Sequence, residues 1–144
     1  MDSNRLTAAW WALRIGLGGA AFLAGLDKYF NLLADWAGYL SPSLAHLLPI
    51  GAATFMHVIG VVEMTVGLAI LAGFTRLGGY VAALWLTSIA IALITTGRYF
   101  DVAVRDVEMA IAAFSLARLT EAGVGARATD GLESPRLSTR VITA

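Results

Sequence analysis

The sequence predicts an all-α integral membrane protein: a four-helix bundle with an interfacial helical segment between its first two spans. Three observations support this class. Of the 144 residues, 58% are hydrophobic, only 14% are charged, and long apolar runs recur along the chain. Soluble domains carry about 25% charged residues, and a helix needs about 20 apolar residues to cross the hydrocarbon core. This composition cannot cover a water-soluble surface.

Charge and cysteine content exclude several function classes. The ten acidic residues balance the ten basic ones, so the chain lacks the positive field that attracts nucleic acid, and we expect no nucleic-acid partner. It contains no cysteine, which excludes disulfides, thiolate metal sites and thiol redox chemistry. No metal-ligand cluster is recognisable either. A redox role would need a non-covalently bound cofactor or a partner protein.

Four apolar runs are predicted to span the membrane within one domain, residues 1–119. The third run contains no charged residue, whereas the fourth carries Arg105, Asp106 and Glu108 in its first turns. Short connections make spans two and three, and spans three and four, antiparallel hairpins. The predicted spans are residues 7–30, 51–73, 77–97 and 102–119.

The connection between the first two spans, residues 31–50, is predicted to lie in the membrane interface. Its apolar residues recur near helical spacing, and Ser41-Pro42 is a start signal for a short helix that ends before Pro49. Aromatic-bearing amphipathic segments of this length lie in the interface rather than cross it. We expect this segment to form a flap over one end of the bundle.

Basic residues favour one orientation. Placing both termini in the cytoplasm puts six arginines inside and three basic residues at the outer ends of the spans. The predicted location is therefore the bacterial inner membrane, with cytoplasmic N- and C-termini. Residues 120–144 lack a core pattern and are predicted to form a cytoplasmic tail.

Ionisable residues inside spans mark either a structural pair or a functional site. Arg14 in span one and Glu63 in span two lie at comparable distances from the cytoplasmic ends of their spans. An Arg14–Glu63 ion pair that clamps the two helices is the structural interpretation. The functional interpretation is that Glu63 carries a proton for a ligand near mid-membrane.

A second polar group is predicted near the outer ends of the spans. Asp27 and Lys28 close span one, His57 lies in span two, and span four contributes Arg105, Asp106 and Glu108. Arg14 and Lys28 are fourteen residues apart, so both face the same side of their helix. Arg105 and Glu108 have the spacing of a local ion pair. The group is either a solvated network that fixes the helix ends or a polar chamber under the flap. The polar-interior candidates are Arg14, Lys28, His57, Glu63 and Glu108; the catalytic candidates are Glu63 and His57.

Small and aromatic residues have structural interpretations. Five glycines are expected to let the first two spans pack closely: Gly16, Gly19, Gly25, Gly60 and Gly67. Three tryptophans are expected to anchor the chain in the interface: Trp10, Trp11 and Trp36.

The order of these motifs resembles the DoxX-like family of four-span bacterial membrane proteins. Span one has Arg14-x-Gly16 and then Gly25-x-x-Lys28; span two has Glu63-x-x-x-Gly67 followed by Gly73 and Arg76; span four opens with Asp106 and Glu108. The resemblance covers residues 8–119. It implies a membrane subunit linked to quinone-dependent redox systems, and a wider likeness to sterol-binding four-span proteins implies a cavity for an isoprenoid or other lipid. The chain lacks a sulfur-handling cysteine, so thiosulfate oxidation by this chain alone is not expected.

The leading hypothesis is a non-catalytic accessory subunit of a larger respiratory or other redox membrane complex, which helps to frame a quinone or lipid site. Its partners would be membrane lipids and the other subunits of that complex. One alternative is a quinone-linked oxidoreductase in its own right, in which Glu63 or His57 exchanges protons with bound quinone. The other is a lipid-binding membrane protein without a redox role.

Overall fold

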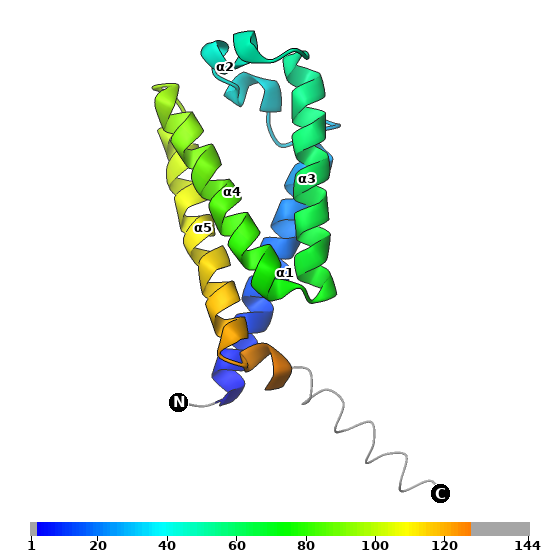
Figure 1. Ribbon diagram of the computed structural model, residues 1–144, viewed down its shortest axis with the longest axis vertical. Helices are drawn as coiled ribbons and strands as arrows, with labels where there is room; N and C mark the ends of the chain where they lie inside the picture. The colour runs from blue at the N-terminus through cyan, green and yellow to red at the C-terminus, as the bar shows by residue number, and fades with distance from the viewer. Residues whose placement is uncertain (1–2, 128–144) are drawn as a thin grey trace, which may run out of the picture.

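Two antiparallel helical hairpins form the body of the protein in the computed structural model, which describes residues 3–127 (Figure 1). The first hairpin pairs α1 (Ser3–Asp27) with α3 (Ala52–Ala72), and the second pairs α4 (Thr75–Thr95) with α5 (Phe100–Glu121). No strand occurs in the described part of the chain. The predicted all-helical class is confirmed there.

Three of these helices are long and apolar enough to cross a membrane: residues Asn4–Asp27, Ala52–Ala72 and Thr75–Thr95. They correspond to the first three predicted spans. The helix α5 matches the fourth predicted span in position but carries four charged residues in its first nine, and it is not among the helices apolar enough to cross. The structure therefore supports a helical membrane protein, and the fourth span remains a prediction.

Glycine contacts bring α1 and α3 close together. A Cβ atom added to Gly25 would lie 2.5 Å from the carbonyl oxygen of Gly60, and one added to Gly67 would lie 2.6 Å from that of Gly18. These contacts confirm three of the predicted packing glycines. Gly16 and Gly19 have no neighbour within 4 Å of such a Cβ atom, so their assignment was wrong, and Gly18 takes their place.

The hairpins join at one end. The core there combines Trp10 and Leu17 of α1, Ile70 of α3, and Ala113 and Leu116 of α5, all buried. Trp10 is 2% exposed and donates a hydrogen bond from Nε1 to Thr120 Oγ1 at 2.8 Å. Trp10 is thus a core residue, which corrects its assignment as an interfacial anchor.

This core continues past the predicted end of the membrane domain at residue 119. Val124 is 4% exposed and belongs to the same cluster, and Gly125 lies against the Trp10 ring. The rest of the predicted tail, residues 128–144, lies outside the described residues.

Toward the other end the two hairpins diverge, and the segment between α1 and α3 lies across the opening (Figure 1). This segment contains a 3₁₀ turn, η1 (Trp36–Tyr39), and a short helix, α2 (Pro42–Leu47). The short helix at Pro42 was predicted from the sequence and is confirmed. Residues 31–50 are called the flap below.

Candidate functional site

A polar cluster lies at the diverging end of the hairpins, where the flap meets α1. Its first member, Asp27, is the last residue of α1 and is 6% exposed. Its carboxylate accepts hydrogen bonds from the backbone N–H groups of Leu32 and Leu33, both at 3.0 Å, and from Trp36 Nε1 at 2.8 Å. These bonds satisfy the buried carboxylate and fix the start of the flap.

Lys28 connects the flap to α3. Its ammonium group forms a 2.5 Å ion pair with Glu63 Oε2, and its Nζ lies 3.8 Å from the centre of the Trp36 ring. The side chains are 4% and 12% exposed for Lys28 and Glu63. A lysine buried this deeply needs a partner of opposite charge, and it obtains both a carboxylate and an aromatic face.

Asp106 of α5 completes the cluster from the second hairpin. It belongs to the buried stripe of α5 together with Ala103, Ala110 and Ala113, and it is 8% exposed. It lies within electrostatic range of Glu63 and Lys28, but no hydrogen bond or ion pair joins it to either residue in the described part of the chain. The polar residues at this end therefore come from both hairpins, and aromatic residues of the flap contact each hairpin.

The flap contacts both hairpins through its aromatic residues. Trp36 packs on Lys28, and its ring also makes an edge contact with Tyr39, with centroids 5.9 Å apart. Tyr39 in turn meets Tyr99, the residue before α5, at 4.8 Å and 89°. A continuous line of contacts thus runs from Glu63 to the start of α5.

Arg14 lies away from this cluster, at the joined end. It donates hydrogen bonds to the carbonyl oxygens of Ile70 at 3.2 Å and Leu71 at 2.5 Å, at the C-terminus of α3. A cation there satisfies free carbonyls and complements the helix dipole. The expected Arg14–Glu63 ion pair is wrong, because Glu63 pairs with Lys28 instead.

His57 lies beside the cluster, near the start of α3. Its half-buried ring stacks on Tyr29 with centroids 4.6 Å apart, and the Tyr29 hydroxyl donates to the His57 carbonyl oxygen at 3.0 Å. This arrangement ties the end of α1 to the start of α3. It gives His57 a packing role in the described structure.

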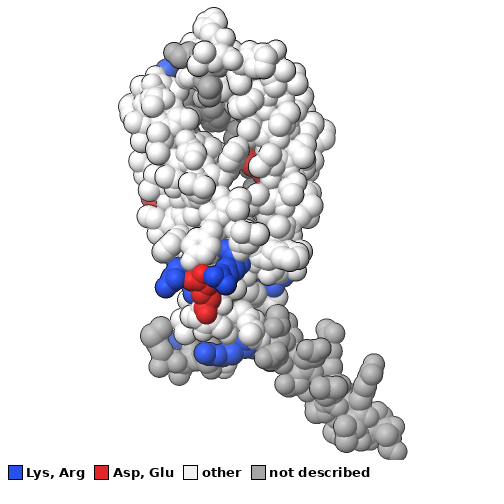
Figure 2. Space-filling view, in the orientation of Figure 1, with Lys and Arg blue, Asp and Glu red and all other residues white. Residues whose placement is uncertain are grey.

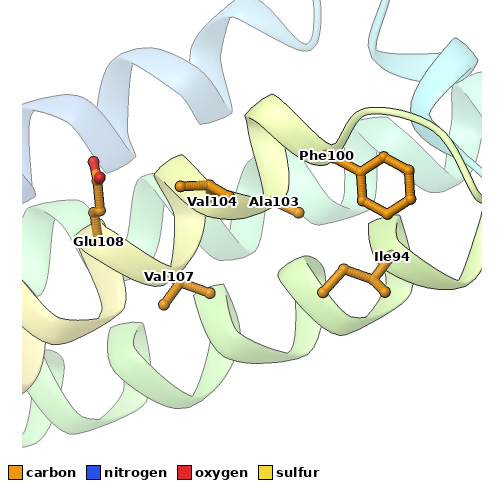
Figure 3. Close-up of a pocket in the computed structure, with 6 residues that line it drawn as sticks. All are labelled: Ile94, Phe100, Ala103, Val104, Val107 and Glu108. Carbon is orange, nitrogen blue, oxygen red and sulfur yellow. The ribbon is translucent and has the colours of Figure 1, made fainter.

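Glu108 is exposed and points away from the buried stripe of α5. It lies at one end of a shallow, almost wholly apolar groove on α4 and α5, with Phe100 and Ile94 at the other end (Figure 3). The expected Arg105–Glu108 ion pair is not formed within residues 3–127. The buried acid of α5 is Asp106 rather than Glu108, which corrects the prediction that Glu108 lines the polar interior.

Three site residues were not among the predicted polar-interior candidates: Asp27, Trp36 and Asp106. Asp27 and Asp106 had been placed only in the wider polar group at the outer ends of the spans. A signal for Asp106 was present in the sequence, because it continues the three- and four-residue spacing of Ala103, Ala110, Ala113 and Ala117. No comparable signal marked Trp36, whose position depends on the path of the flap.

Charged residues on the surface gather at the joined end (Figure 2). Arg76 of α4 and Arg118 of α5 both pair with Glu121, at 3.0 Å and 2.5 Å. Above them the face shown is nearly free of charge, apart from a few atoms of acidic residues that are visible between the hairpins (Figure 2). The region between the diverging hairpins around Lys28, Glu63 and Asp106, whose side chains are all largely buried, is called the inter-hairpin recess.

Comparison of the chain with protein-family models, with curated proteins and with solved structures found no match.

Proposed function

We propose that this chain is a four-span protein of the bacterial inner membrane that binds a quinone or a lipid in the inter-hairpin recess, as a non-catalytic accessory subunit of a redox or respiratory-type complex. The proposal includes membership of the DoxX-like family and cytoplasmic termini. It treats α5 as the fourth span. In support, α5 runs antiparallel to α4 and exposes Val104, Val107, Ile111 and Phe114, as a lipid-facing helix would.

The observation that carries the proposal is the buried Lys28–Glu63 pair beneath Trp36. An ammonium group with free donors can bind a carbonyl or hydroxyl oxygen, and an aromatic ring beside it suits a flat headgroup. Apolar helix faces around the recess would hold an isoprenoid or acyl tail. Ligand sites with a few polar groups in an apolar surround are the usual design for such molecules.

Both catalytic candidates already have structural partners, and this favours the accessory role over catalysis. Glu63 is held by Lys28, and His57 is stacked on Tyr29. Each has a structural partner, so their first role is to build the site. The alternative, a quinone-linked oxidoreductase, draws its support from Asp106, because a second carboxylate near Lys28 and Glu63 could accept a proton that Glu63 releases.

Purification from native membranes in a mild detergent tests this proposal. We expect the chain to elute with other membrane subunits in fixed stoichiometry, and solvent extraction to release quinone or lipid that Lys28→Met removes. Arg76→Gln, which alters a 71% exposed side chain at the opposite end, is the matched control and should retain the ligand. Elution of the chain alone would disprove the subunit role. Equal ligand content in the Lys28→Met and native proteins would disprove the site.

A further inference from the structure

A second pocket lies at the joined end, against the turn between α3 and α4. Gly73 ends α3 with a φ of 111°, a left-handed conformation that suits glycine, and α4 begins at Thr75. The pocket has a volume of about 590 Å³ and mostly apolar walls, and small-ligand sites commonly measure about 300–1,000 Å³. We call it the turn pocket. It is lined by Gly73, Phe74, Arg76, Leu77, Tyr80 and Thr120.

Arg76 brings a partly compensated cation to the turn pocket. Glu121 accepts a hydrogen bond from Arg76 Nε at 3.0 Å and another from Arg118 at 2.5 Å, so one carboxylate serves two guanidinium groups. A guanidinium has five N–H donors, and Arg76 uses one of them within residues 3–127. The N–H groups of its two terminal nitrogens therefore remain for a ligand. Paired N–H groups of this kind bind phosphate oxygens well.

The joined end as a whole is basic. Of the acids in residues 3–127, only Glu121 lies there, whereas the others lie in the flap or toward the diverging end. A positive field of this kind attracts anions and repels cations. Basic pockets between membrane helices bind the headgroups of anionic lipids. Five described arginines lie at the joined end: Arg5, Arg14, Arg76, Arg118 and Arg127.

The apolar part of the turn pocket indicates an amphiphile rather than a free anion. Phe74 and Leu77, on either side of Arg76 in the sequence, are 68% and 69% exposed. Tyr80 continues this surface one turn further along α4 and makes an edge contact with Phe114 of α5, with ring centroids 5.9 Å apart. Acyl chains would cover these side chains. A soluble phosphate would leave them uncovered.

We propose that the turn pocket binds an anionic phospholipid, whose phosphate accepts hydrogen bonds from Arg76 and whose acyl chains lie against Phe74 and Leu77. Phosphatidylcholine carries a quaternary ammonium group beside its phosphate, and that group would lie among the arginines, so it binds more weakly. The turn pocket and the inter-hairpin recess are at opposite ends of the molecule. This lipid site therefore does not depend on the ligand proposed for the recess.

Native mass spectrometry of the full chain tests the preference. The protein is released from mixed micelles that contain equal amounts of phosphatidylglycerol and phosphatidylcholine with identical acyl chains. We expect phosphatidylglycerol to bind about fivefold more tightly, as a single basic residue at the membrane surface would produce. Equal binding of the two lipids would overturn the inference. Glycerol phosphate, which has no acyl chains, should not displace the bound lipid; displacement at lipid concentrations would show a soluble-phosphate site instead and overturn the lipid assignment.

Variants locate the preference at Arg76. Arg76→Gln should reduce it to about twofold or less. Arg98→Gln, which removes the same charge from an exposed side chain beyond the other end of α4, should leave it unchanged. An unchanged preference in Arg76→Gln, or an equal loss in Arg98→Gln, would overturn the site. The lipid comparison on the native chain needs no variant, so it stands even where Arg76→Gln does not fold.

The two binding sites can fail separately. Lys28→Met, which should empty the recess, should retain phosphatidylglycerol in the turn pocket, because the two sites share no residue. Arg76→Gln should lose phosphatidylglycerol and keep the recess ligand. Loss of phosphatidylglycerol from a folded Lys28→Met protein would overturn the assignment of this lipid to the turn pocket.

Discussion

Lys28 connects three parts of the molecule with one side chain. It extends from the end of α1, pairs with Glu63 of α3 and lies against Trp36 of the flap. Removing one partner of a buried ion pair leaves the other charge without compensation, and this costs more than removing both. The effects of substituting Lys28 and Glu63 on the free energy of unfolding are therefore expected to be strongly non-additive.

Lys28→Met should lower the free energy of unfolding by about 3–5 kcal/mol, because it leaves Glu63 buried and unpaired. The double variant Lys28→Met with Glu63→Leu should recover most of that loss. Thermal unfolding in detergent, followed by circular dichroism, measures both. Arg76→Gln is the control for an exposed pair and should change stability by about 1 kcal/mol or less. Additive losses in the double variant would contradict the coupling.

Glu63 also separates the accessory role from catalysis. If Glu63 exchanges protons with a bound quinone, Glu63→Gln should abolish quinone reduction by the purified complex, because an amide cannot carry the proton. We expect the complex to retain quinone reduction, because the amide oxygen of Gln can still accept a hydrogen bond from Lys28 and the proposed role of this residue is structural. A complete loss of activity in a folded Glu63→Gln complex would support the oxidoreductase alternative.

Asp27 controls the start of the flap through three hydrogen bonds. Asp27→Asn removes the charge that strengthens them, so the amides of Leu32 and Leu33 should exchange with deuterium about tenfold faster or more. Asp35→Asn, an exposed carboxylate in the same segment, should leave their exchange unchanged. Unaltered exchange in Asp27→Asn would show that the flap is fixed elsewhere.

At the scale of elements, the spacing between α1 and α3 depends on glycines that are seven residues apart on each helix. Gly18 and Gly25 face Gly67 and Gly60, and the neighbouring atoms are mostly backbone. A backbone atom cannot move aside as a flexible side chain can, so any added Cβ must separate the helices. The same contacts set the register that places Lys28 near Glu63.

Gly67→Ala should therefore destabilise the protein by about 1–3 kcal/mol through overpacking, because its Cβ would lie 2.6 Å from the Gly18 oxygen and 2.7 Å from the Phe22 nitrogen. Gly16→Ala, where nothing lies within 4 Å, should be neutral or slightly stabilising, as expected for an open helix position. Thermal unfolding of both variants makes the comparison. A stable Gly67→Ala protein would contradict the close packing.

The sequence predicted the helices and the flap well, because apolar runs and the Ser41-Pro42 signal are local properties. It failed on the partner of Glu63 for a physical reason. The prediction compared the membrane depths of Arg14 and Glu63 by counting residues from the ends of their spans. In the structure the contact between Gly18 and Gly67 sets the register of the two helices. Arg14 and Leu71 are each four residues from that contact, so they lie at the same level. Register depends on contacts between helices, and a long lysine side chain can reach more than one turn along them.

At the scale of the whole molecule, the two hairpins share a core at one end and diverge at the other (Figure 1). The charged surface network of Arg76, Arg118 and Glu121 marks the joined end. This asymmetry is what a membrane protein with its binding site near one leaflet would have. In the proposed topology Arg76, at the joined end, and Arg98, between α4 and α5 at the diverging end, lie on opposite sides of the membrane.

The chain contains no cysteine, so single cysteines can report that topology without background. Arg98→Cys in intact cells should react with a membrane-impermeant maleimide, because it lies at the proposed outer end. Arg76→Cys should react only after the membrane is opened. Both side chains are exposed, which makes them a matched pair. The reverse labelling pattern would overturn the proposed orientation.

The contact between Tyr39 and Tyr99 also orders the events of synthesis. Chains emerge from the ribosome N-terminus first, so α1, the flap and α3 exist as a pair before Tyr99 has been made. The α4–α5 hairpin then forms from neighbours in sequence, which is rapid. Until residue 99 has been added, Tyr39 has no partner on the second hairpin, whereas Lys28, Trp36 and Glu63 have all been made. The contact between the flap and the second hairpin is therefore among the last that synthesis makes possible.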